Sequence, residues 1–201
     1  MDYMIQGLIV GMIIGIPLEQ AAEMLVQNAS IHGLRNGMAA GFGASAAYLI
    51  FASADALIVS LLSKYILKAE PVLGYLVAGI FIVIGLIAIL RKENNYDTDN
   101  SDSSCFMNAM NGFMLGFTNK FAFPSIIYLY LYFGIRHMKF TEGVILAAST
   151  AAGAFVWWFV IALFANILGK IKEIKNIKIY KTLSNLFVIM VGIVIIITKL
   201  M

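Results

Sequence analysis

Long apolar stretches alternate with short polar ones along most of this 201-residue chain. A helix needs about 20 mostly apolar residues to cross the hydrocarbon core of a bilayer. Stretches of this kind run over residues 3–26, 37–62, 71–90, 143–169 and 182–198. A further apolar segment, 105–135, is longer than one simple span requires. The pattern therefore predicts six transmembrane helices.

Composition supports this prediction. The chain is 61% hydrophobic and only 12% charged, whereas about a quarter of the residues of a soluble domain are charged. Most of the surface is therefore expected to face lipid, and we predict an all-α integral membrane protein. The formal net charge of +3 is small and the basic residues lie mostly in predicted loops, so no nucleic-acid partner is expected.

The residue types that commonly hold metals or form disulfides are scarce. Cys105 is the only cysteine, which excludes an internal disulfide. The two histidines, His32 and His137, both lie in predicted loops and make a poor metal site. No cofactor or metal is therefore expected.

A polar stretch, "RKENNYDTDNSDSSC" (91–105), separates residues 1–90 from residues 106–201 and is typical of a flexible linker. Landmark residues recur across it at a nearly constant offset of 106 or 107 residues: Pro17 and Pro124, Gly85 and Gly192, Lys92 and Lys199, and Gly37 and Gly143. The offset predicts two repeats of three helices each. Because three is odd, the second repeat enters the membrane from the opposite side. Such inverted repeats are common in transporters.

The basic residues predict the orientation. Loops after the first, third and fifth spans hold eight Lys and Arg residues, whereas the other loops and the C-terminal end hold five. Cytoplasmic loops are enriched in Lys and Arg. A multi-pass protein of the plasma (inner) membrane with both termini outside is therefore favoured.

The segment "GFTNKFAFPSIIYLYL" (116–131) places polar residues and a proline inside an apolar stretch. Proline lacks an N–H and clashes with the carbonyl four residues earlier, so helices are expected to break at Pro17 and Pro124. Irregular backbone is tolerated at membrane depth only where protein or a water-filled cavity surrounds it. A half-helix N-terminus at such a place attracts a carboxylate. A single proline would indicate a packing kink, but the repeated pair predicts a ligand site.

Charged residues near these breaks need partners. Lys120 costs roughly 3 kcal/mol at the centre of a membrane helix. Glu19 and Glu23 lie four residues apart, on one helical face. Glu23 is expected to be solvated near the end of its span, whereas Glu19 fits either a solvated position or a proton- or ammonium-binding one. Asp55, 18 residues into the second span, is a third acidic candidate, with a position near the interface slightly favoured.

Other side chains have more ordinary predicted uses. Asn119 suits a helix contact or a ligand contact. Tyr128, Tyr130 and Tyr132 are predicted to form an interfacial aromatic belt. Trp157 and Trp158 are predicted to pack. The small residues over 37–47 are expected to allow close helix approach.

Three motifs resemble the lysine-exporter superfamily of amino-acid translocators. They are "GIP" (15–17), "HGLRNGMAAGFGASAAYL" (32–49) and "GFMLGFTNKFAF" (112–123). The family's Gly-Pro and Gly-Arg motifs correspond to Gly15 with Pro17 and to Gly33 with Arg35, and its Gly/Ala-rich helix to the stretch that holds Gly37, Gly41 and Gly43. The chain departs from the pattern, since it lacks Pro-Gly-Pro, an acidic residue early in the second span and a proline directly after Asn119. It is thus similar to a divergent member.

The resemblance and the residues together predict a secondary transporter, not an enzyme, that exports an amino acid or similar small zwitterion by proton antiport. The candidate binding residues are Gly15, Pro17, Glu19, Asp55, Asn119, Lys120 and Pro124. The resemblance is compatible with a homodimer. Alternatives are a divalent-cation exporter and a non-transporting membrane scaffold. A membrane enzyme is disfavoured because no catalytic triad, zinc motif or phosphate loop is present.

Overall fold

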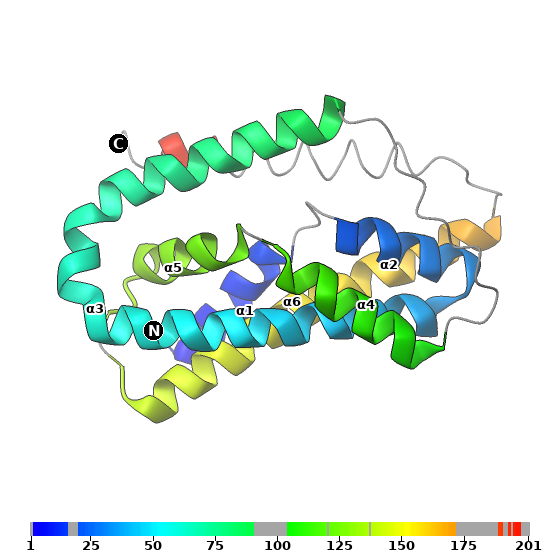
Figure 1. Ribbon diagram of the computed structural model, residues 1–201, viewed down its shortest axis with the longest axis horizontal. Coiled ribbons are helices and arrows are strands. Elements are labelled where there is room, and N and C mark those ends of the chain that lie inside the picture. The colour runs from blue at the N-terminus through cyan, green and yellow to red at the C-terminus, as the bar shows by residue number, and fades with distance from the viewer. Residues whose placement is uncertain are drawn as a thin grey trace.

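The computed structural model describes residues 2–15, 20–90, 104–119, 121–136, 138–171, 189–190, 193 and 195–197. Within these residues it is all-helical and contains no strand (Figure 1). The main helices are α1 (Tyr3–Ile14), α2 (Gln20–Ile31), α3 (Leu34–Leu90), α4 (Cys105–Phe117), α5 (Ala122–Tyr132) and α6 (Phe140–Ile171). The all-α prediction is confirmed.

The segments that hold Pro17 and Pro124 are both interrupted helices. α1 ends at Ile14 and α2 begins at Gln20, while α4 ends at Phe117 and α5 begins at Ala122. Pro17 lies outside the described residues. Pro124 is the third residue of α5, where no intrahelical hydrogen bond needs its missing N–H. The interruption in this segment thus precedes the proline, rather than falling at it as predicted.

The predicted second and third spans both belong to α3. This helix runs along the lower part of Figure 1, turns back at the left edge and returns across the top. Its first part, Leu34–Leu62, and α6 over Phe140–Ile167 are long and apolar enough to cross a membrane. α1 and α5 are shorter apolar helices, and most of the predicted sixth span, 182–198, lies outside the described residues.

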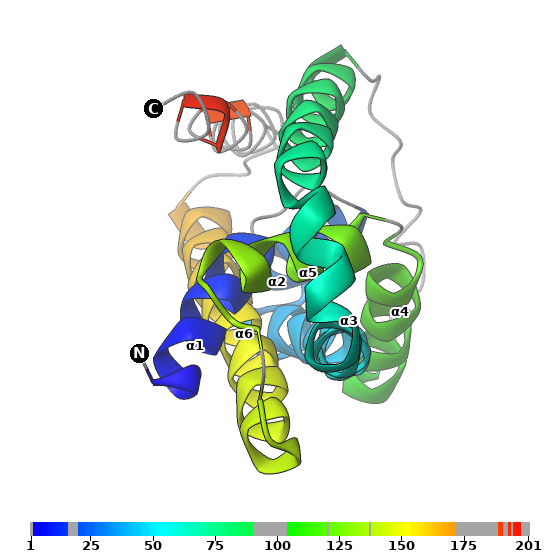
Figure 2. The ribbon, with the colours of Figure 1, turned by 90° about the vertical axis from the view of Figure 1, so that its left-hand side faces the viewer.

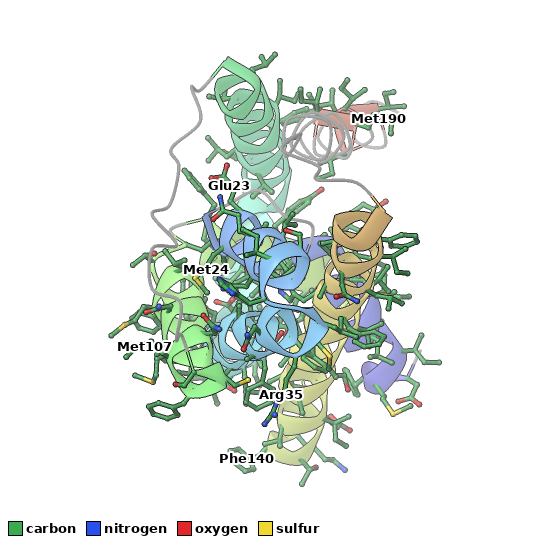
Figure 3. The ribbon with its side chains drawn as sticks, turned by 90° about the vertical axis from the view of Figure 1, so that its right-hand side faces the viewer. Glu23, Met24, Arg35, Met107, Phe140 and Met190 are labelled. Carbon is green, nitrogen blue, oxygen red and sulfur yellow. The ribbon has the colours of Figure 1, made fainter. Side chains whose placement is uncertain are left out.

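Many large apolar side chains lie on the surface. Leu61 is 79% exposed and Phe140 is 76% exposed, and Figure 3 shows Phe140 at the tip of α6. Soluble monomers rarely expose large contiguous apolar patches. Together with the two apolar helices, this surface favours association with a membrane.

The two halves of the chain pack crosswise. α1 and α2 of the first half pack against α6 of the second, and α4 and α5 of the second half pack against α3 of the first (Figure 2). α2 also packs on α3. Each interrupted segment therefore lies against the long helix of the other half.

Glycines bring these helices together backbone to backbone. A Cβ added at any of six glycines would meet the partner helix. In the α1–α6 pair, Gly11 meets Thr150, Gly15 meets Ala154 and Gly153 meets Leu8; in the α4–α3 pair, Gly112 meets Ala40, Gly116 meets Ala44 and Gly43 meets Ala109. Small residues permit such close helix approach, as predicted for the stretch 37–47.

The two sets of contacts correspond one to one. Residues of α4 are numbered 101 above their counterparts in α1, and residues of α6 are numbered 110 above their counterparts in α3. These offsets differ from the 106–107 of the sequence landmarks, so Gly37 and Gly143 are not counterparts in this packing. The offset rises by about nine residues from the first helix to the long helix, because the connection from α5 to α6 is longer than that from α2 to α3 and because α6 begins further before its first counterpart contact than α3 does.

Candidate functional site

Asp55 lies on the inner face of α3, in line with Tyr48, Ala52 and Val59. All four side chains are buried, and Asp55 is 0% exposed. Neither of its carboxylate oxygens has a hydrogen-bond partner. The solvated surroundings expected of an interfacial Asp55 are therefore wrong. An ionised carboxylate is costly to bury without a partner, so this position is suited to hold a proton or to bind a cationic group.

A hydrogen-bonded pair of hydroxyl groups lies near Asp55. The Tyr130 Oη on α5 is 2.9 Å from the Thr150 Oγ1 on α6, and both side chains are fully buried. Tyr130 lies within electrostatic range of Asp55. Thr150 Oγ1 also donates to the carbonyl of Leu146 at 2.8 Å. Because a threonine hydroxyl has a single hydrogen, Tyr130 must be the donor to Thr150, and its lone pairs are left to accept.

The predicted aromatic belt is wrong for two of its three tyrosines. Tyr128 and Tyr130 are both 0% exposed, whereas Tyr132 is 45% exposed. α5 packs against both α3 and α1, so the two tyrosines are enclosed although they cannot share one helical face. Tyr130 and Thr150 were missed as site residues because nothing in the local pattern links two residues on different helices.

Asn119 bridges the interruption between α4 and α5. Its Oδ1 accepts from the backbone N–H groups of Phe121 and Ala122, each at 2.9 Å. Its Nδ2 donates to the Tyr48 hydroxyl at 3.2 Å. Two donors at the N-terminus of α5 are thus occupied, and Pro124 supplies none, so few remain for a substrate carboxylate.

Of the other acidic and site residues predicted from the sequence, the structure describes some and not others. Gly15 is buried, and a Cβ there would lie 3.1 Å from the Cα of Ala154. Glu23 is half-buried on the side of α2 that faces the returning part of α3 (Figure 3). Pro17, Glu19 and Lys120 lie outside the described residues. The structure therefore places Asp55 and Gly15 inside the helical assembly. Asn119 is half-buried, and it contacts the face of α3 that carries Asp55 through its bond to Tyr48.

A second polar cluster lies where α2 meets α4, and the sequence did not single it out. Asn28 donates through Nδ2 to the Oδ1 of Asn108 at 3.2 Å, and both side chains are buried. The Oε1 of neighbouring Gln27 is buried without a hydrogen-bond partner. Buried amides of this kind hold helices together in lipid.

No family model, curated protein or solved structure matches this chain. Membership of the lysine-exporter superfamily is therefore a prediction from motifs alone. In the described part of the chain, no group of three or more His, Cys, Asp or Glu residues is arranged to hold a metal ion.

Proposed function

We propose that this chain is a multi-pass membrane transporter that exports an amino acid or a similar small zwitterion in exchange for protons. Its two halves would be inverted repeats. The observation that carries the proposal is the crosswise packing, in which equivalent glycine contacts join each interrupted helix to the long helix of the other half. Transporters of this architecture bind substrate near the membrane midplane, where repeats meet and helices are interrupted.

The parallel course of the packed helices agrees with this topology. Along α1 and α6, Gly11 meets Thr150 and Gly15 meets Ala154, so residue numbers rise together. The same holds for α4 and the first part of α3. In an inverted pair of three-helix repeats, the first and fifth spans run in one direction and the second and fourth in the other. α1 and α6 belong to the first and fifth spans, and the first part of α3 and α4 belong to the second and fourth. Both packed pairs therefore agree with this condition.

The site would use different groups for the two ends of a zwitterion. Asp55 is the acidic group available to an ammonium, and backbone N–H groups at the interruptions are available to a carboxylate. Because Asn119 already occupies two donors of α5, the carboxylate would bind at the interruption after Gly15 or displace Asn119. We include Glu19 and Lys120, which lie beside the two interruptions in the sequence, among the proposed binding residues.

Counterflow in proteoliposomes tests the function. Vesicles preloaded in turn with each of a panel of unlabelled amino acids are diluted into traces of the same labelled compound, and protein-free vesicles serve as the control. We expect accumulation of a subset of the panel, which is lost in Glu19→Gln if Glu19 lines the site. No accumulation of any amino acid by folded protein would contradict the proposal. Calorimetric titration with divalent metals would then separate a cation exporter from a scaffold.

A further inference from the structure

Asp55 is the only charged side chain that the structure describes as buried. Its two oxygens lack hydrogen-bond partners, and no salt bridge engages it within the described part of the chain. Ionisable residues inside membrane proteins are rare and mark proton or ion pathways. A buried carboxyl group that pairs with no cation and no hydrogen-bond partner has no evident structural use.

Among the side chains that the structure describes, the helices around Asp55 offer it no cation. α5 contributes Tyr128, Tyr130 and Tyr132. On its own helix, Tyr48 is buried on the same face, whereas Arg35 and Tyr75 are exposed. The described titratable groups of the other helices are half-buried: Tyr3 of α1, Glu23 of α2, Cys105 of α4 and Glu142 of α6. Lys120, between α4 and α5, lies outside the described residues. The described group within electrostatic range of Asp55 is thus the Tyr130 hydroxyl rather than a counter-ion.

The O–H groups of Tyr130 and Thr150 both donate to other acceptors, so neither is left to donate a hydrogen bond to Asp55. Thr150 donates to Leu146, and Tyr130 donates to Thr150. The Tyr130 oxygen and the Asp55 carboxylate then both present lone pairs. A group with several N–H or O–H donors and a positive charge satisfies both at once, whereas an anion satisfies neither.

We propose that Asp55 holds the coupling proton and the ammonium group of the substrate in turn, never both at once. The Tyr130 oxygen, which its bond to Thr150 keeps in place, is a second acceptor for that ammonium. This inference rests on the proposed function and deepens it. It limits the substrates to compounds with a protonated amine, and it makes Asp55 rather than Glu19 the coupling acid. When the ammonium binds, the carboxyl proton leaves to water, and no other bond is made or broken.

Labelling with dicyclohexylcarbodiimide tests the site without any transport assay. The O–H of a protonated carboxyl adds across one C=N bond of the reagent: the oxygen bonds to the carbon and the proton goes to nitrogen, and the adduct rearranges to a stable N-acylurea. Mass spectrometry of the purified full chain should find this adduct on Asp55. Methylammonium chloride should reduce the labelling, whereas tetramethylammonium chloride, which has no N–H donor, should not. An unlabelled Asp55, or equal effects of the two salts, would overturn the proposal.

Two acid-to-amide variants complete the test. Asp55→Asn should lose proton-coupled exchange at least tenfold while its Tm in detergent stays equal or rises, because an unpartnered buried acid is removed. The matched control Glu142→Gln, at the start of α6, should exchange like the wild type. If the wild type exchanges amino acids and Asp55→Asn does so with the same dependence on a pH gradient, the inference is wrong but the function stands. If the wild type exchanges none, the proposed function is wrong, and the labelling result still decides whether Asp55 binds protons and ammonium groups.

Discussion

The hydroxyl groups of Tyr130 and Thr150 lie 2.9 Å apart in the interior and join α5 to α6. Thr150 also lies on the face of α6 that receives Gly11 of α1. This residue therefore connects the α5 segment of the second half with the first helix of the chain. The contact between Gly11 and Thr150 lies where the proposed repeats meet, so changes at Thr150 should affect stability and exchange together.

Tyr130→Phe removes the hydrogen bond to Thr150 and keeps the ring. We expect a loss of stability of about 1 kcal/mol, the usual worth of such a bond between helices, seen as a lower Tm in detergent. Thr150 keeps its bond to Leu146, so the fold should survive. The matched control is Tyr132→Phe, whose side chain is 45% exposed. Equal Tm values for the two variants would show that the Tyr130–Thr150 bond contributes nothing.

Gly11→Ala and Gly112→Ala test the crosswise packing. A Cβ at Gly11 would lie 2.8 Å from the backbone nitrogen of Ala154, so α1 and α6 would have to separate. The counterpart substitution at Gly112 would meet the backbone of Ala40. Each is expected to cost about 1–3 kcal/mol, the usual range for overpacking, measured by unfolding in detergent.

Gly79→Ala is the control for these two variants. Nothing lies within 4 Å of the position where its Cβ would be. Alanine in a helix interior is favoured over glycine by roughly 0.5–1 kcal/mol, so stability should hold or rise. If Gly11→Ala behaves like Gly79→Ala, α1 does not pack on α6 as described.

Much of this fold could be predicted from local pattern. Apolar stretch length predicted an all-helical chain, Pro17 and Pro124 predicted that two segments are interrupted, and the Gly/Ala run over 37–47 predicted close packing. Each of these sequence patterns lies in, or within a few residues of, the helix, interruption or contact that it predicts. The position of the second interruption was less accurate, because proline is tolerated in the first turn of α5.

The interior of the site could not be predicted in the same way. A helix that is apolar on all sides gives no periodic sign of which face meets protein and which meets lipid, so Asp55 and the tyrosines of α5 were placed at an interface. The continuity of α3 through 63–70 was missed because the polar residues there resemble a loop. The packing counterparts of the two halves depend on contacts between distant residues, which the spacing of Pro17 and Pro124 does not reveal.

Asn119 variants separate its two roles. Asn119→Asp keeps the side-chain acceptor that caps α5 and loses the donor to Tyr48, whereas Asn119→Ala loses both. Loss of a helix cap usually costs about 1 kcal/mol. The alanine variant should therefore have the lower Tm of the two. Identical Tm values would mean that the cap does not stabilise α5.

Inverted repeats place the two short connections on opposite membrane faces. Arg35, just after the α2–α3 turn, and Arg136, in the α5–α6 connection, are both exposed. Single cysteines at these positions, in a Cys105→Ser background, should react differently with an impermeant maleimide added to intact cells. The charge distribution favours Arg35 inside, so Arg136→Cys should label directly and Arg35→Cys only after permeabilisation. Labelling of both from the same side would contradict the inverted topology.

The most direct test of proton-coupled export is efflux driven by a pH gradient. Vesicles that contain the protein are loaded with a labelled amino acid identified by counterflow, and the external medium is then acidified. Under proton antiport, efflux should accelerate as protons enter in exchange, and a protonophore should remove the acceleration. Efflux at an unchanged rate under the gradient would contradict proton antiport.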